Sequence, residues 1–213
     1  MKLVIGNRNY SSWSLRAWMA MEAFGIPREE EVVPLDQPES AARIAAFSAA
    51  GRVPVLLDGD LAVWDSLAIC EYLAERFPER GLWPTDPAAR AVARSACAEM
   101  HSGFQALREA CPMKCKEVFD PKPLAPEVQA NVARIVALWE ECRRRFGQGG
   151  PFLFGAFSLA DAFYAPVVSR FRTYGVKLPG PAEAYAQAMW AHPAMQKWLA
   201  AARAETFAMK RYG

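Results

Sequence analysis

The chain has no apolar run that approaches the roughly 20 residues needed to span a bilayer, so a membrane is not an expected partner. It also has no basic stripe, because its 25 Lys and Arg are scattered among 23 Asp and Glu, for a formal charge of +2. The one dense cluster, Arg143-Arg144-Arg145, falls at the predicted end of a helix, where cations interact favourably with free carbonyls. Nucleic acid is therefore not an expected partner either.

Cysteine and histidine are scarce as well, with five Cys and two His in 213 residues. The cysteines have no His partners at the spacing of a zinc site, and most of them fall within helical patterns. We expect reduced core thiols and no metal site. The opening segment 1–6 predicts a strand rather than a signal peptide, which favours the cytoplasm. The cysteines are Cys70, Cys97, Cys111, Cys115 and Cys142.

The apolar fraction of 53% is enough to build the cores of two modest domains. Residues 1–78 predict a strand, a helix and a strand, then a hairpin and a helix, which is the layout of a thioredoxin-like α/β domain. The segment 37–50, which connects the second strand to the hairpin, also has helical character. The predicted elements are strands 3–5 and 31–35, a helix over 14–24, a hairpin of 55–57 with 61–64, and a helix over 66–77.

Residues 79–87 contain prolines and a glycine, so we interpret them as a linker. The remainder, 88–213, is predicted to form an all-α domain. Its apolar residues recur at helical spacing over 88–110, 127–146, 161–171 and 183–202, with an interruption at His192-Pro193. Ser158 and Asp161 have the spacing of a capping box at the start of one of these helices.

The segment from Arg52 to Ser66 carries the most information about function. Pro54 stands at the mouth of a short apolar run, where a residue without an N–H group must lie at a strand's start or edge. The sequence Asp58-Gly59-Asp60 predicts a hairpin turn. Asp65-Ser66 then precede a helix, whose free N–H groups suit an anion while the Asp65 carboxylate suits an ammonium group.

This arrangement closely resembles the glutathione-binding half of the cytosolic glutathione S-transferase family. The resemblance implies that Val53, before a cis-proline at Pro54, offers its backbone to the cysteinyl part of glutathione, and that Asp65-Ser66 hold the γ-glutamyl end. The capping box at Ser158 is also found in the helical domain of this family, so the resemblance covers essentially the whole chain. It implies glutathione as substrate and a homodimer in which helix 66–77 packs against the partner's helix 90–107.

The chemistry is expected where the first strand meets the first helix, because a free thiol of pKa about 8.5 is a poor nucleophile until it ionises. A hydroxyl and N–H groups at a helix start would favour the thiolate. The string Ser11-Ser12-Trp13-Ser14-Leu15-Arg16 is similar to the Ser-Ser-Cys-Ser-x-Arg motif of zeta-class transferases, which implies that Ser11 is the catalytic residue. We favour Ser11 over Ser12 and Tyr10. Trp13 departs from the motif, which has Cys at that position. Ser11 and Ser14 have the spacing of the Cys-x-x-Cys pair of thioredoxins and glutaredoxins, so these residues cannot carry out dithiol exchange.

The predicted glutathione contacts are Ser11, Arg52, Val53, Pro54, Asp65 and Ser66, and the predicted electrophile pocket contains Trp13, His101, Arg108 and Met113. Each residue also has a structural interpretation. Ser11, Ser12 and Asp65-Ser66 could cap helices, Pro54 could be a turn residue, and a lone helical His101 is more often a hydrogen-bonded structural residue. Tyr164 and Phe171 fit either the pocket or the core. Arg108, Arg170 and Arg172 could pair with an acidic substrate or lie on a solvated helix face.

The predicted function is therefore glutathione transfer, in which a thiolate stabilised by Ser11 attacks a small electrophilic or hydrophobic molecule held against the helical domain. One alternative is a glutathione-dependent isomerase of the maleylacetoacetate type, although the substrate arginine of zeta-class enzymes falls nearest Thr173. The other is a non-catalytic glutathione-binding or interaction module, because folds of this kind also serve as scaffolds.

Overall fold

The computed structural model describes residues 1–209, and residues 210–213 lie outside the described part of the chain. The first part contains β1 (Lys2–Ile5), α1 (Ser12–Ala23), β2 (Glu29–Val32), α2 (Ser40–Ala45), β3 (Val55–Asp58), β4 (Leu61–Trp64) and α3 (Ser66–Arg76). The second part begins after the 3-10 turn η1 (Pro78–Arg80) and contains α4 (Pro87–Ser102), α5 (Gln105–Ala110), α6 (Pro126–Phe146), α7 (Leu159–Thr173), α8 (Gly180–Ala191) and α9 (Pro193–Ala204).

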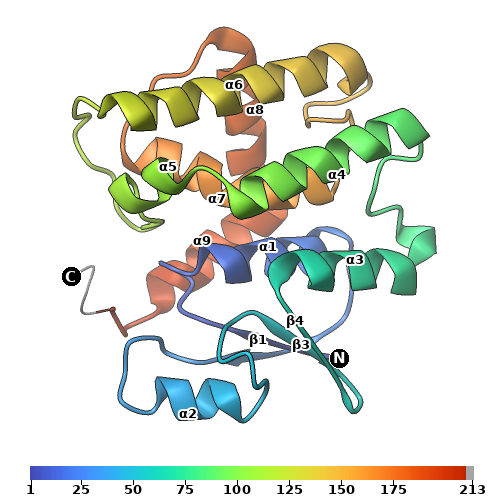
Figure 1. The fold of residues 1–213 in the computed structure, drawn as a ribbon, viewed down its shortest axis with the longest axis vertical. Helices are drawn as coiled ribbons and strands as arrows, with labels where there is room; N and C mark the ends of the chain where they lie inside the picture. The colour runs from blue at the N-terminus through green and yellow to red at the C-terminus, as the bar shows by residue number, and fades with distance from the viewer. Residues whose placement is uncertain (210–213) are drawn as a thin grey trace.

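The four strands form one mixed sheet in the order β2-β1-β3-β4, with β1 and β2 parallel and the other pairs antiparallel. Successive side chains of a strand point to opposite faces, so Leu3 and Ile5 join the large core, while Val4 joins a smaller cluster with Ile44 of α2. Helices α1 and α3 lie on the face of the sheet that is turned toward the helical part, and α2 covers the opposite face (Figure 1). The predicted combination of a thioredoxin-like α/β fold with a helical fold is confirmed.

The helical part is organised around α7, which is buried at nearly every position. The ring of Trp139 on α6 contacts the rings of Tyr164, Phe171 and Tyr185. Of the two interpretations given for Tyr164 and Phe171, the structure agrees with the core, because both side chains belong to it. Helix α7 also packs against α1, which fixes the helical part over the start of α1 (Figure 1). No helix of the described residues is both long and apolar enough to cross a membrane.

Three predicted elements differ from the structure. The helix expected over 88–110 ends at Ser102, because Gly103 has an extended backbone and Phe104 has a φ of +62°. Glycine suits this position, since a Cβ there would meet the Glu99 carbonyl oxygen at 2.8 Å. The strand expected over 31–35 spans Glu29–Val32 and stops before Pro34, which has no N–H group to donate. Of the segment 37–50, residues Ser40–Ala45 are α-helical.

The predicted capping box at the start of α7 is confirmed. The Asp161 carboxylate accepts hydrogen bonds from the Ser158 backbone at 2.8 Å, the Ser158 hydroxyl at 3.1 Å and the Leu153 backbone at 3.1 Å. Because the carboxyl group is fully buried, burial raises its pKa to about 6, and the hydrogen bonds oppose that shift. Asp161 therefore makes the stability of this fold depend on pH.

The sign of this dependence follows from the proton count. An unfolded chain releases the Asp161 proton near its ordinary pKa of 3.8, whereas the folded protein keeps it up to about 6, so the stability due to this proton is lost as pH rises through that window. We expect the difference in free energy of unfolding between wild type and Asp161→Asn to shrink by about 2 kcal/mol between roughly pH 4.5 and pH 7.5. Urea unfolding at both pH values measures the difference, and an unchanged difference would contradict the expectation.

Candidate active site

Two neighbouring cavities lie where the sheet meets the helical part. The first has a volume of about 350 Å³ and the second of about 660 Å³, and Trp13, Arg52 and Val53 line both of them. The first cavity also contacts Tyr10, Ser11, Ser12, Arg108, Met113 and Arg170, whereas the second contacts Pro54, Trp64, Asp65, Ser66 and His101. The predicted glutathione contacts and the predicted electrophile contacts thus lie around two cavities that share part of their lining.

Ser11 ends the turn that connects β1 to α1, where its backbone N–H donates to the Asn7 carbonyl at 2.8 Å. Its hydroxyl does not cap the helix; it donates instead to the Ser14 hydroxyl at 2.7 Å, which also accepts the Gly6 N–H at 3.1 Å. Each hydroxyl carries one proton and can rotate, so Ser14 can donate to Ser11 and leave the Ser11 proton for an anion. The Ser11 hydroxyl therefore lines the first cavity, and its hydrogen bond with the Ser14 hydroxyl fixes its position there.

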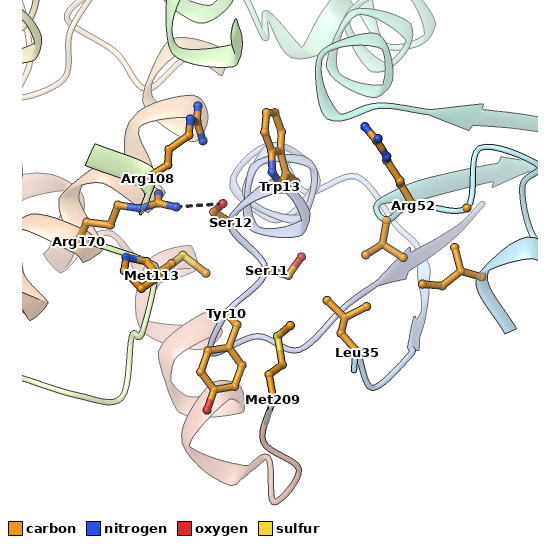
Figure 2. Close-up of a pocket in the computed structure, with 14 residues that line it drawn as sticks. Tyr10, Ser11, Ser12, Trp13, Leu35, Arg52, Arg108, Met113, Arg170 and Met209 are labelled. Atoms are coloured by element: carbon orange, nitrogen blue, oxygen red, sulfur yellow. Dashed lines mark hydrogen bonds between the residues drawn. The ribbon is translucent and has the colours of Figure 1, made fainter. Parts of the chain in front are cut away.

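The two competing residues are oriented differently. The Ser12 hydroxyl faces the helical part and accepts a hydrogen bond from Nη2 of Arg170 at 3.3 Å. Figure 2 shows Ser11 between the wall formed by Arg170 and Met113 and the wall formed by Leu35 and Arg52, with the Tyr10 hydroxyl directed away from it. Of the three candidates, Ser11 is the one that occupies the middle of the cavity.

The peptide bond between Val53 and Pro54 is cis, and Pro54 is followed directly by β3. Both residues line the second cavity, and Val53 also lines the first. A ligand that extends from one cavity to the other therefore passes Val53.

Asp65 and Ser66 stand at the start of α3. Oδ1 of Asp65 accepts the Leu67 N–H at 2.7 Å, so this residue does cap the helix, as the structural interpretation expected. Its Oδ2 atom lies 3.3 Å from Nε2 of His101. The Ser66 hydroxyl is fully buried and has no hydrogen-bond partner among the described residues. A buried polar group in that state calls for a partner, and this one lines the second cavity.

His101 links the two parts of the fold, because its imidazole on α4 contacts both Asp65 and the Trp13 ring, whose centroid is 5.1 Å away. Burial lowers the pKa of His101, although the Asp65 charge opposes that shift. The neutral ring can donate its Nε2 proton to Asp65. The sequence placed His101 in the electrophile pocket, whereas the structure places it beside the carboxylate of the second cavity.

Arg16 is a residue whose position sequence reasoning missed, although it ends the Ser-Ser-x-Ser-x-Arg string. Its guanidinium is fully buried and lies 4.3 Å from the Trp13 ring centroid, and two of its nitrogen atoms, Nε and Nη1, have no partner among the described residues. Burial lowers the pKa of Arg16 to about 9, helped by Arg108 and Arg170. The guanidinium still carries its charge at neutral pH.

The C-terminal segment also contributes to the site. Met209 is buried and lines the first cavity, and the segment before it is held where Glu205 accepts the Arg8 N–H at 2.8 Å. The remaining tail residues, 210–213, lie outside the described residues. Among residues 1–209, no group of three or more His, Cys, Asp or Glu could hold a metal ion, and all five cysteines are free thiols in buried positions.

Known proteins share the sequence and the fold of this chain. The chain is 29% identical over 176 residues to a zeta-class glutathione S-transferase from Euphorbia esula, covering 79% of this chain and 77% of the relative. It is 29% identical over 163 residues to a stringent starvation protein A homologue from Pasteurella multocida, with coverage of 73% and 68%. A glutathione transferase homologue from Burkholderia gl BGR1, solved with bound glutathione, has the same fold with a TM-score of 0.72 at 24% identity, over 96% of this chain and 98% of that one.

Family models match both parts of the chain. The glutathione S-transferase N-terminal domain matches residues 10–76, which contain Ser11, Val53 and Asp65. The glutathione S-transferase C-terminal domain matches residues 125–201, which contain the capping box. The chain therefore belongs to the glutathione S-transferase family.

Proposed function

We propose that this protein is a glutathione transferase, in which Ser11 stabilises the glutathione thiolate for attack on an electrophilic small molecule. One observation carries the proposal: the two cavities share Val53 in their lining, and Asp65-Ser66 line the one while Ser11 lines the other. Groups suited to an ammonium and a carboxylate therefore lie on one side of Val53, and a hydroxyl suited to a thiolate lies on the other. Glutathione presents the matching groups in the same order.

The second cavity supplies the groups for binding the tripeptide. The α-ammonium of the γ-glutamyl group pairs with Asp65, and its carboxylate accepts hydrogen bonds from the unpartnered Ser66 hydroxyl and the N-terminus of α3. The cysteinyl backbone pairs with Val53, as extended peptides do with free strand ends. Arg52, which lines both cavities, offers a cation to the glycine carboxylate.

The first cavity supplies the chemistry. The thiol of bound glutathione loses its proton to solvent, and the resulting thiolate accepts the Ser11 O–H at the positive end of α1. The sulfur then forms a bond to the electrophilic carbon, and the leaving group departs with its electron pair. Tyr10, Trp13, Met113 and Met209 line the space for the second substrate.

Proton release gives a direct test. Calorimetry of glutathione binding at neutral pH, repeated in buffers of different ionisation enthalpy, should reveal protons released as the thiol ionises. S-Methylglutathione has the same peptide contacts but no ionisable thiol, so it should bind without that release. Equal proton uptake or release for the two ligands would contradict thiolate stabilisation, and an electrophile panel then separates a transferase from a binding module that shows no turnover.

The isomerase alternative is favoured by the Ser11-Ser12-x-Ser14-x-Arg16 string, which matches the zeta-class motif except at Trp13. In that reaction glutathione adds to the substrate and leaves again, so it is regenerated. Conversion of maleylacetoacetate without consumption of glutathione would establish this alternative. Formation of a stable conjugate would establish transfer.

Assembly and location remain part of the proposal. We propose a homodimer in which α3 of one protomer packs against α4 of the other, and light scattering at several protein concentrations measures the mass. The five free thiols suit a reducing compartment such as the cytoplasm.

A further inference from the structure

We infer that the second substrate is an acidic electrophile, a planar carboxylate whose anionic group binds at the wall formed by Arg108 and Arg170. This inference rests on the proposed function and specifies its substrate class. The first cavity contacts three arginines, Arg52, Arg108 and Arg170, and no Asp or Glu is among the described residues that line it.

Arg108 is the principal anchor. Its guanidinium is half-buried and donates to the carbonyls of Gly103, at 2.9 Å, and Met100. These neutral partners hold its position without neutralising its charge, and Arg108 forms no ion pair with a described residue. Arg170 lies on the same wall, where its Nε atom donates to the Cys111 carbonyl at 2.9 Å. Figure 2 shows both guanidinium groups on the side of Ser12 and Met113, opposite Arg52.

Arg16 adds a buried positive charge near this wall, although it does not line the cavity itself. The buried Arg16 guanidinium lies 4.3 Å from the Trp13 ring centroid, and the Arg108 guanidinium lies 5.0 Å from it. Two arginine charges therefore lie against one ring in a region of low dielectric, where like charges repel each other strongly. Burial is the main cause of the lowered pKa of Arg16, and repulsion by Arg108 and Arg170 lowers it further. A bound carboxylate would relieve that repulsion.

The remaining lining residues define the rest of the ligand. The Trp13 ring presents aromatic surface next to Arg108, Met113 and Pro112 add apolar surface elsewhere in the lining, and Leu35 closes the side opposite the helical part. A planar ligand with its carboxylate at Arg108 extends from that wall toward Ser11, where the sulfur would lie. The third arginine considered from the sequence, Arg172, is exposed and instead stacks 4.5 Å from the Trp190 ring centroid, away from this cavity.

4-Chloro-3-nitrobenzoate is a suitable probe, with 4-chloro-3-nitrobenzamide as its neutral counterpart. The thiolate sulfur forms a bond to the ring carbon that bears chlorine, and the carbon–chlorine bond breaks with departure of chloride and its electron pair. The two products are S-(4-carboxy-2-nitrophenyl)glutathione and the matching carboxamide. Both conjugates can be prepared chemically, so their binding is measurable without turnover.

Calorimetry of the two conjugates tests the inference. The wild type should bind the carboxylate conjugate at least about tenfold more tightly than the carboxamide, because the carboxylate accepts charge-assisted hydrogen bonds that the neutral amide cannot form. Arg108→Gln should abolish that preference, and Arg108→Lys should restore part of it. Arg172→Gln is the matched control and should keep the full preference, since it removes an arginine of α7 that lies outside the cavity.

Equal affinity of the wild type for the two conjugates would overturn the inference, and so would a preference that survives Arg108→Gln. If glutathione itself binds in that case, the transferase proposal stands and only the substrate class is wrong. If neither glutathione nor either conjugate binds, both proposals fail. The wild-type comparison needs no variant, so a misfolded Arg108→Gln protein leaves the test intact.

Discussion

Replacement of Ser11 by alanine should lower kcat/KM about 100-fold and raise the pKa of the bound glutathione thiol by one unit or more. Loss of one preorganised donor to a developing or formed anion typically costs a factor of 10² to 10³. A hydrogen bond to a charged group contributes roughly 1.5–3 kcal/mol, and each pKa unit corresponds to about 1.4 kcal/mol. The Ser11 hydroxyl is preorganised here, because its Oγ atom lies 2.7 Å from the Ser14 Oγ atom in a hydrogen bond.

A titration of the ultraviolet thiolate absorbance of bound glutathione measures the pKa directly, alongside steady-state kinetics. Ser12→Ala and Tyr10→Phe serve as comparisons, because Ser12 bonds to Arg170 and the Tyr10 hydroxyl is directed away from Ser11. Both should shift the thiol pKa less than Ser11→Ala does. A thiolate titration of Ser11→Ala that matches wild type would remove Ser11 from the mechanism, and the largest shift in either comparison variant would transfer its function to that residue.

Features set by neighbouring residues in the chain could be predicted from the sequence. Asp58-Gly59-Asp60 ends β3 and forms the turn to β4, and the capping box of Ser158 with Asp161 begins α7. The break at Pro193 separates α8 from α9 as expected. Each of these depends on turn or capping chemistry within a few residues, where sequence spacing and spatial distance are nearly the same.

Features that join distant segments could not be predicted in this way. The pair of Asp65 with His101 links α3 to α4, and the first cavity brings Arg108 of α5 together with Arg170 of α7. The sequence offered Arg108, Arg170 and Arg172 as equivalent candidates, since charge alone does not tell which face of a helix is covered. Only packing separates Arg172 from the other two, and the same is true of Met209, which reaches the cavity from beyond α9.

Glutathione should bind about 30-fold more weakly to Asp65→Asn than to wild type, while the fold stays intact. Oδ1 of Asp65 caps α3 through the Leu67 N–H, and the residue has a φ of +77°. Asparagine accepts the same capping bond and is among the residues that tolerate positive φ. The substitution therefore removes the charge that pairs with the ligand ammonium and leaves the helix start in place, at a cost of about 2 kcal/mol in binding.

A ligand without the ammonium group isolates this interaction. Glutaryl-cysteinyl-glycine is glutathione without its α-amino group, so it should bind wild type and Asp65→Asn with nearly equal affinity. The four affinities form a double-mutant cycle between protein and ligand, in which the coupling energy measures the ion pair alone. Equal weakening of both ligands by Asp65→Asn would mean that Asp65 acts only through the shape of the α3 start, and the γ-glutamyl ammonium would then have to bind elsewhere in the second cavity.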